Sequence, residues 1–191
     1  MRLELSALAI AFVSVALLFD FLNGFHDSSN CVGTVIASRS MSPRAALLMA
    51  AIADFCGPLI FGIAVATALG KGIVLPQAVS IWVAFAALCS AIFWNLLTWY
   101  LAVPSSSSHA LVGGLIGSAS AAHGFSVIHL DGLAKVLIAL FLAPLSALAA
   151  GYVLMRGIMF LVRGASPKIN WLFKRLQIPA SLALALSHGT N

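Results

Sequence analysis

Charged residues are scarce in this chain of 191 residues. Asp, Glu, Lys and Arg make up 8% of it, whereas hydrophobic residues make up 62%. Soluble domains carry about 25% charged and roughly 45–50% apolar residues, so this composition excludes an ordinary soluble domain. The apolar runs are long and continuous rather than alternating, which predicts spanning helices of about 20 residues and not a barrel. We therefore expect an all-α membrane protein in a lipid bilayer.

Cysteine is rare as well. Cys31, Cys56 and Cys89 are odd in number, and they lack the spacing of a metal motif. We interpret them as small core residues and expect no cofactor. The net charge of +5 does not indicate a nucleic-acid partner, because five of the ten basic residues lie within residues 156–175. A cytoplasmic loop explains that cluster.

Five spanning segments are predicted, and they cover residues 3–22, 45–69, 78–103, 110–122 and 133–155. The first is too long for the apolar region of a cleavable signal peptide. It is followed by a polar stretch, 23–30, and a short apolar piece, 31–37, which predicts a broken or re-entrant helix. Loops 39–44 and 156–175 hold seven of the ten basic residues. The positive-inside rule therefore predicts a multi-pass protein of the plasma membrane, with the amino terminus outside and 156–175 in the cytoplasm.

The first polar motif reads Asn-Gly-Phe-His-Asp-Ser-Ser-Asn over residues 23–30. Asn23, Asp27 and Asn30 have i, i+4, i+7 spacing and share one face of a helix. Polar groups inside a membrane segment are costly and usually face a pathway or one another. Oxygens of Asp27 and Asn30 suit a hard cation such as Na⁺, while Asn23 and Asp27 are candidates for binding an anionic substrate together with its cation. A solvated loop is the alternative.

Two further groups are candidates for carrying a coupling cation. Asp54 lies inside the predicted span 45–69, where an unpaired carboxylate is expensive, so we expect a cation or proton partner. A hydrogen bond to a neighbouring helix is the alternative for this residue. His26 stands beside Asp27, and an imidazole, with an ordinary pKa of about 6.5, exchanges protons at neutral pH. His26, Asp27, Asn30 and Asp54 together form the predicted cation-coupling set.

The second polar motif begins at Pro104 and continues with Ser105, Ser106, Ser107, Ser108 and His109. Proline is favoured at the first position of a helix, and serine caps that turn. A helix start presents free N–H groups and the positive end of the helix dipole, which together bind anions. Four hydroxyls beside those N–H groups predict a site for a tetrahedral oxyanion built without arginine. A capped helix that binds nothing is the alternative.

Both motifs resemble elements of one known family. Residues 23–30 resemble the first signature of the inorganic phosphate transporter (PiT) family, and residues 104–114 resemble its serine-rich element. The ending 187–191 resembles the opening of the second signature, which adds Asn191 to the substrate-binding candidates. The resemblance implies symport of inorganic phosphate with H⁺ or Na⁺, and it leaves open a divalent metal bound to the phosphate. The form with His26 before Asp27 resembles the proton-coupled members and favours H⁺.

The resemblance also implies two related repeats of opposite orientation around the site. Residues 1–155 are then expected to form the first repeat, 156–177 a basic cytoplasmic linker, and 178–191 the truncated start of the second repeat. Five predicted crossings separate the two signatures, and an odd number gives inverted repeats. We expect one half of an inverted-repeat transporter, with the missing second repeat as its partner. A homo-oligomer is left open.

Three other functions compete with phosphate symport. A sulfate permease of the same family would bind a similar oxyanion, and an anion channel would line a pore with the serines. Saturable transport driven by a cation gradient separates a carrier from a channel. Ser108, His109 and Asp27 suggest a hydrolase triad, but no G-x-S-x-G or metal-ligand pattern accompanies them. We therefore expect no enzyme.

Overall fold

The computed structural model describes residues 2–62 and 72–190, most of which are helical. In chain order the elements are α1 (Arg2–Ala37), α2 (Pro43–Phe61), the short 3-10 helix η1 (Pro76–Ala78), α4 (Ile81–Tyr100), α5 (Ser107–His123), the 3-10 helix η2 (Phe125–Val127), α6 (Leu130–Leu161) and α7 (Ile169–Gly189). Four of the helices in these ranges, α1, α2, α4 and α6, are long and apolar enough to cross a membrane. The expected all-α membrane class is confirmed.

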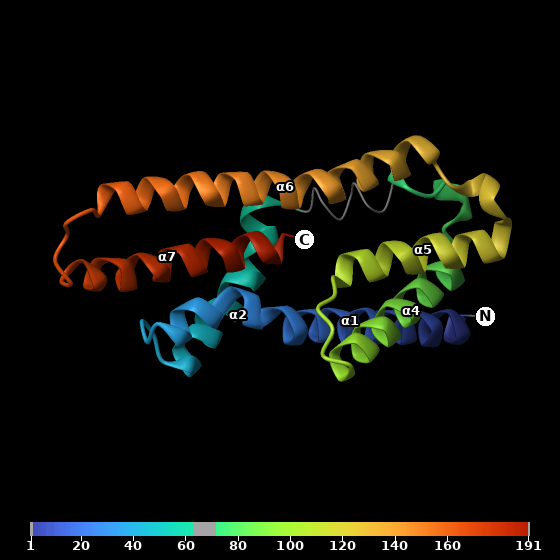
Figure 1. Cartoon of the computed structure of the whole chain (residues 1–191). Coiled ribbons are helices and arrows are strands. Elements are labelled where there is room, and N and C mark those ends of the chain that lie inside the picture. The colour runs from blue at the N-terminus through green and yellow to red at the C-terminus, as the bar shows by residue number, and fades with distance from the viewer. Residues whose placement is uncertain (1, 63–71, 191) are drawn as a thin grey trace.

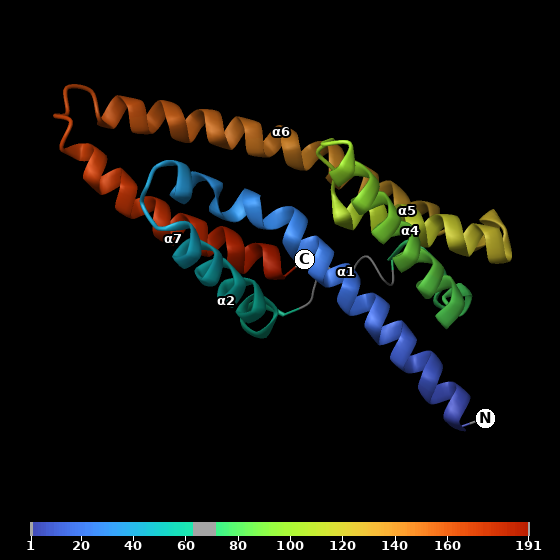
Figure 2. The same cartoon turned by 90° about the horizontal axis from the view of Figure 1, so that it is seen from below.

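The helices form two packed groups that α1 connects. α2 packs along α7, α4 packs along α5, and α1 contacts α2, α7 and α4 (Figures 1 and 2). In Figure 1, α6 runs along the edge of the molecule opposite α1, and none of its residues is buried. The polar motif of α1 therefore lies where the two groups meet.

Small residues bring α2 and α7 close together. Ala46, Ala50, Ala53 and Gly57 are buried on one face of α2, at the spacing of three and four residues that shares a face. Such faces let helix backbones approach closely inside a membrane. A β-carbon at Gly189 of α7 would overlap the backbone carbonyl of Asp54. The close approach places the end of α7 beside Asp54, whose side chain is a carboxylate.

α4 and α5 form a helical hairpin. At its base the Leu75 N–H donates to the Val127 carbonyl at 2.9 Å, and the His129 N–H donates to the Ile73 carbonyl at 2.8 Å. At the other end Ser106 caps α5, because its Oγ accepts from the His109 N–H at 3.4 Å. This serine-rich end contacts α1 at residues 23–30, partway along that helix. The two polar motifs therefore contact each other midway along a long apolar helix.

The expected break in the first signature needs correction. α1 continues as one α-helix through residues 23–30. The stretch contains no proline, and its polar side chains on one face reach partners on α5 and α7. Because these tertiary contacts satisfy the side chains, the backbone does not have to unwind to hydrate them.

Helix lengths also differ from the predicted spans. α5 covers the predicted span 110–122 but has only 17 residues, fewer than the about 20 that a crossing requires. α6 continues to Leu161 and α7 begins at Ile169, so the basic segment from 156 is largely helical. The last part of the predicted span 45–69, residues 63–69, lies outside the described residues, as does Asn191.

Candidate functional site

The first turn of α5 is seated on the polar face of α1. Ser107 donates from its Oγ to the Asn23 Oδ1 at 2.5 Å, and the same Oγ lies 3.3 Å from the Asp27 Oδ2. Ser107 is 4% exposed, whereas Asn23 and Asp27 are partly buried. The structure thus brings together one serine of the second motif with the amide and the carboxylate of the first.

Asp27 is flanked by two histidines. The Nδ1 of His26 lies 3.1 Å from the Asp27 Oδ1, and the Nε2 of His188 lies 3.4 Å from the Asp27 Oδ2. Ser107 shares the second oxygen, so both oxygens of this carboxylate have polar neighbours. Asp27 is therefore the central group of the site, contacted from α1, α5 and α7.

His188 was missed among the candidates from the sequence. Its ring also approaches Asp54, with the Nδ1 3.5 Å from the Asp54 Oδ1, so one imidazole stands between two carboxylates. The only signal was the likeness of residues 187–191 to a second signature, because no spacing rule joins His188 to Asp27 across 161 residues. This contact joins Asp54 to a side chain of a neighbouring helix, which was the alternative for this residue; a cation or proton partner for Asp54 stays a prediction.

The remaining residues of the serine-rich motif have different environments. Ser106 is used as the cap of α5, and Ser105 accepts a hydrogen bond from the Trp94 indole N–H at 3.0 Å. Ser108 borders a pocket of about 390 Å³ that Asn23 and Ser107 also line. His109 is exposed and borders a different pocket, of about 480 Å³, with Ser105 and Ser106.

Among the described residues no hydrogen bond joins Asn30 to Asp27, although the two lie one turn apart on α1. Asn30 is exposed, and it lines a pocket of about 460 Å³ with His26 and Ser105. The oxygens nearest Asp27 come instead from Ser107, which is itself bonded to Asn23. A hard cation at Asp27 would therefore find its further oxygen ligands on Ser107 and Asn23 rather than on Asn30. Asn191, the last candidate, lies outside the described residues.

The junction of α1 and α5 combines groups that attract an anion with one group that repels it. The start of α5 offers N–H groups, hydroxyls and the positive end of a helix dipole, all of which attract an anion. Asp27 repels an anion at the same place unless a cation neutralises it. At an effective dielectric constant of about 20, two unit charges about 4 Å apart interact by about 4 kcal/mol. Such a site favours an anion and a cation bound together over an anion alone.

The sequence of this chain matches a family model and several known proteins. Residues 23–171 match the family model described as "Phosphate transporter family". A "Probable low-affinity inorganic phosphate transporter" of Bacillus subtilis (strain 168) is 40% identical over 188 residues, which is 96% of this chain and 56% of that protein. A relative of the same description from Streptomyces halstedii is 40% identical over 186 residues, 95% of this chain and 86% of that protein.

A solved structure shares the fold. The structure titled "The sodium-dependent phosphate transporter" has a TM-score of 0.75 and 20% sequence identity, and the match covers 95% of this chain and 54% of that one. The chain thus spans about half the length of this structure and of the Bacillus subtilis relative.

Proposed function

Because this chain belongs to the phosphate transporter family, we propose that it supplies one half of a carrier that moves inorganic phosphate across the membrane together with a cation. The four long apolar helices and the family make it a multi-pass membrane protein. Its relatives bear the names of transporters rather than enzymes. The hydrolase reading of Ser108, His109 and Asp27 is set aside.

One observation carries this proposal: Ser107, at the start of α5, bonds Asn23 and touches Asp27. The helix start supplies the anion-binding groups, and the carboxylate supplies the requirement for a cation. An anion channel passes its ion without a cation. A carboxylate that repels the anion by about 4 kcal/mol would therefore only slow its passage. The junction therefore supports symport over a pore.

The orientation and the repeat plan belong to the same proposal. We take residues 1–155 as one repeat and 156–177 as a basic cytoplasmic linker, with 178–191 opening a second, inverted repeat and the amino terminus outside. The approach of His188 to Asp27 supports a site shared between the two repeats, because substrate sites of such carriers lie at the repeat interface. The coupling cation we propose is H⁺, as the His26–Asp27 form favours, with Na⁺ as the alternative.

Phosphate uptake by a Ser107→Ala variant of the complete transporter tests the site. A hydrogen bond to a charged group contributes roughly 1.5–3 kcal/mol, so phosphate affinity should fall roughly 10- to 100-fold at equal abundance in the membrane. Ser146→Ala is the matched control, because Ser146 is exposed on α6 and its hydroxyl, among the described residues, bonds only the Ala143 carbonyl of its own helix. Equal uptake by both variants would remove Ser107 from the site.

Competition separates phosphate from sulfate. Both are tetrahedral oxyanions that a helix start and hydroxyls would accept. We expect unlabelled phosphate, but not an equal concentration of sulfate, to block uptake of labelled phosphate by the parent. Equal inhibition by the two ions would reassign the carrier to both oxyanions or to sulfate.

A further inference from the structure

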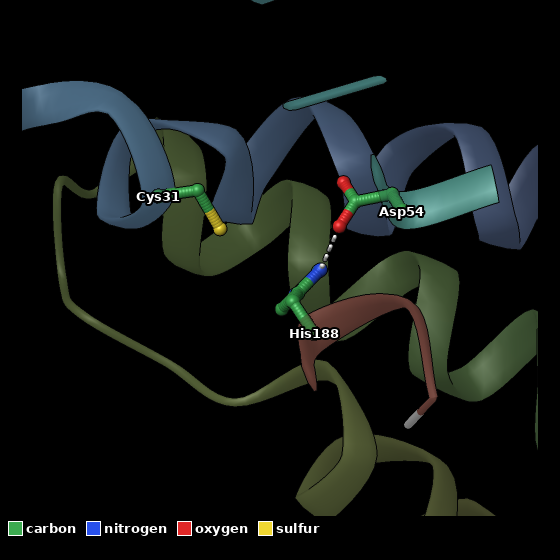
Figure 3. Close-up of side chains that lie close together, drawn as sticks. All are labelled: Cys31, Asp54 and His188. Carbon is green, nitrogen blue, oxygen red and sulfur yellow. Dashed lines mark ion pairs between the residues drawn. The ribbon is translucent and has the colours of Figure 1, made fainter. Parts of the chain in front are cut away.

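Three metal-ligating side chains from three different helices converge beside the phosphate site. Cys31 of α1, Asp54 of α2 and His188 of α7 each offer a donor atom, and these atoms all lie within 4.8 Å of one another. Figure 3 shows the three side chains pointing toward one another. We propose that they bind a divalent cation of the Zn²⁺ class.

The chemistry of the donors selects the metal. A thiolate, an imidazole and a carboxylate are the ligands of Zn²⁺, whereas Na⁺, Mg²⁺ and Ca²⁺ prefer oxygen alone. Zinc bonds of 2.0–2.3 Å in a tetrahedral site separate neighbouring ligand atoms by roughly 3.5 Å. The most distant pair of donors therefore has to close by about 1 Å, a movement within reach of side-chain rotation. Three protein ligands leave the fourth position for water or an anion oxygen.

The orientation of His188 supports the assignment. Its Nε2 lies 3.4 Å from the Asp27 Oδ2, while its Nδ1 faces the Asp54 Oδ1 at 3.5 Å. Histidine ligands usually donate their other ring N–H to a carboxylate, which fixes the tautomer that leaves the second nitrogen free for the metal. Asp27 stands in the place of that carboxylate.

Cys31, which is buried, and Asp54, which is partly buried, complete the arrangement. The Asp54 Oδ1 is buried and accepts no hydrogen bond within residues 2–62 and 72–190, and its nearest polar neighbour is the His188 Nδ1 at 3.5 Å, the other proposed ligand atom. Cys31 is 2% exposed, which protects a thiolate–metal bond from water and oxidants. The carbonyl of the same Cys31 accepts the hydroxyl of Ser181 on α7, and this bond holds α7 against α1 at the level of the cluster.

A metal here would tie α1, α2 and α7 together and orient the Asp27 carboxylate through His188. The proposal does not depend on phosphate being the substrate, because it concerns binding of the metal alone. The competing view is that Cys31 is only a small packing residue, as the sequence predicts.

Metal binding to the purified full chain decides between these views. The chain is stripped with a chelator, kept in detergent without phosphate, and titrated with Zn²⁺ by calorimetry and with Co²⁺ by absorbance. We expect one Zn²⁺ per chain, no displacement by Mg²⁺, and a thiolate-to-cobalt charge-transfer band in the near ultraviolet. Failure of the well-folded parent to bind Zn²⁺ would overturn the proposal while leaving phosphate transport untouched.

Variants identify the ligands. Cys31→Ser should lose the charge-transfer band, and Cys56→Ser, the control on α2, should keep it. Asp54→Asn, nearly isosteric and only partly buried, should weaken Zn²⁺ at least about tenfold, and Asp27→Asn should weaken it roughly 10–100-fold through the orientation of His188. Size-exclusion profiles confirm that each variant is folded. A band that persists in Cys31→Ser, or parental Zn²⁺ affinity in Asp54→Asn, would contradict the assignment.

Discussion

Replacing Gly114 by alanine should loosen the hairpin that presents Ser107. Gly114 is buried on α5, and a β-carbon there would lie 2.6 Å from the Ala87 carbonyl oxygen and 3.2 Å from the Ala87 Cα on α4. Both neighbours are backbone atoms, which cannot rotate away. Gly114 also lies seven residues after Ser107, on the same face of α5, so a shift of this face moves Ser107 relative to Asn23.

The expected magnitude follows from two opposing effects. Overpacking of a tight contact is destabilising by about 1–3 kcal/mol, whereas alanine in place of glycine stabilises a helix by roughly 0.5–1 kcal/mol. Gly114→Ala should therefore be net destabilising, by up to about 2.5 kcal/mol. For a chain of this size 1 kcal/mol shifts the unfolding midpoint by about 2–4 °C, so we expect a midpoint lower by a few degrees.

Gly117→Ala is the control on the same helix. Among the described residues, nothing beyond the chain neighbours and the nearby backbone of α5 lies within 4 Å of a β-carbon at Gly117, so only the gain in helix propensity remains and the midpoint should rise slightly. Thermal unfolding in detergent, followed by fluorescence, measures both variants, and phosphate uptake should fall in Gly114→Ala alone. A midpoint that rises equally in the two variants would refute the close packing of α5 on α4.

Two other predictions concern coupling and orientation. Phosphate uptake into proteoliposomes of the complete transporter should follow an imposed pH gradient without Na⁺, because H⁺ is the proposed coupling ion; strict dependence on Na⁺ would replace H⁺ by Na⁺. The orientation is tested with single introduced cysteines in a background in which Cys89, which is exposed, is changed to serine. In intact cells a membrane-impermeant thiol reagent should label Ser126→Cys, in the predicted outer loop. It should not label Ser166→Cys, in the predicted cytoplasmic turn. Labelling of Ser166→Cys from outside would invert the orientation.

Local patterns predicted the start of α5 well. Pro104 and the serines after it marked a helix start, and the structure begins α5 at Ser107 with Ser106 as its cap. Pro104 itself lies two residues before the cap and not at the first helical position that the sequence predicted. Such a signal is readable because a cap involves only residues within one helical turn. The class of the protein was equally accessible, since long apolar runs without charge have few alternatives to membrane helices.

Tertiary contacts decided what the sequence did not predict. The polar stretch 23–30 reads locally as an interruption, but α1 continues through it because Ser107 and His188 supply polar partners from other helices. Cys31, Asp54 and His188 come from three separate helices, so no spacing rule for metal ligands brings them together. Chains of this kind need the fold before their sites can be recognised.

Binding of labelled phosphate to the purified complete transporter tests the central claim most directly, when it is measured in the parent and in Asp27→Asn with the coupling cation supplied (low pH for H⁺, or added Na⁺) and with it scarce (high pH without Na⁺). If Asp27 makes phosphate binding depend on a cation, the parent should bind phosphate much more weakly without it, up to roughly 1000-fold for a repulsion of about 4 kcal/mol. Asp27→Asn should bind phosphate with little dependence on the cation and should fail to accumulate phosphate in vesicles. A cation dependence of binding that is unchanged in Asp27→Asn would contradict the account.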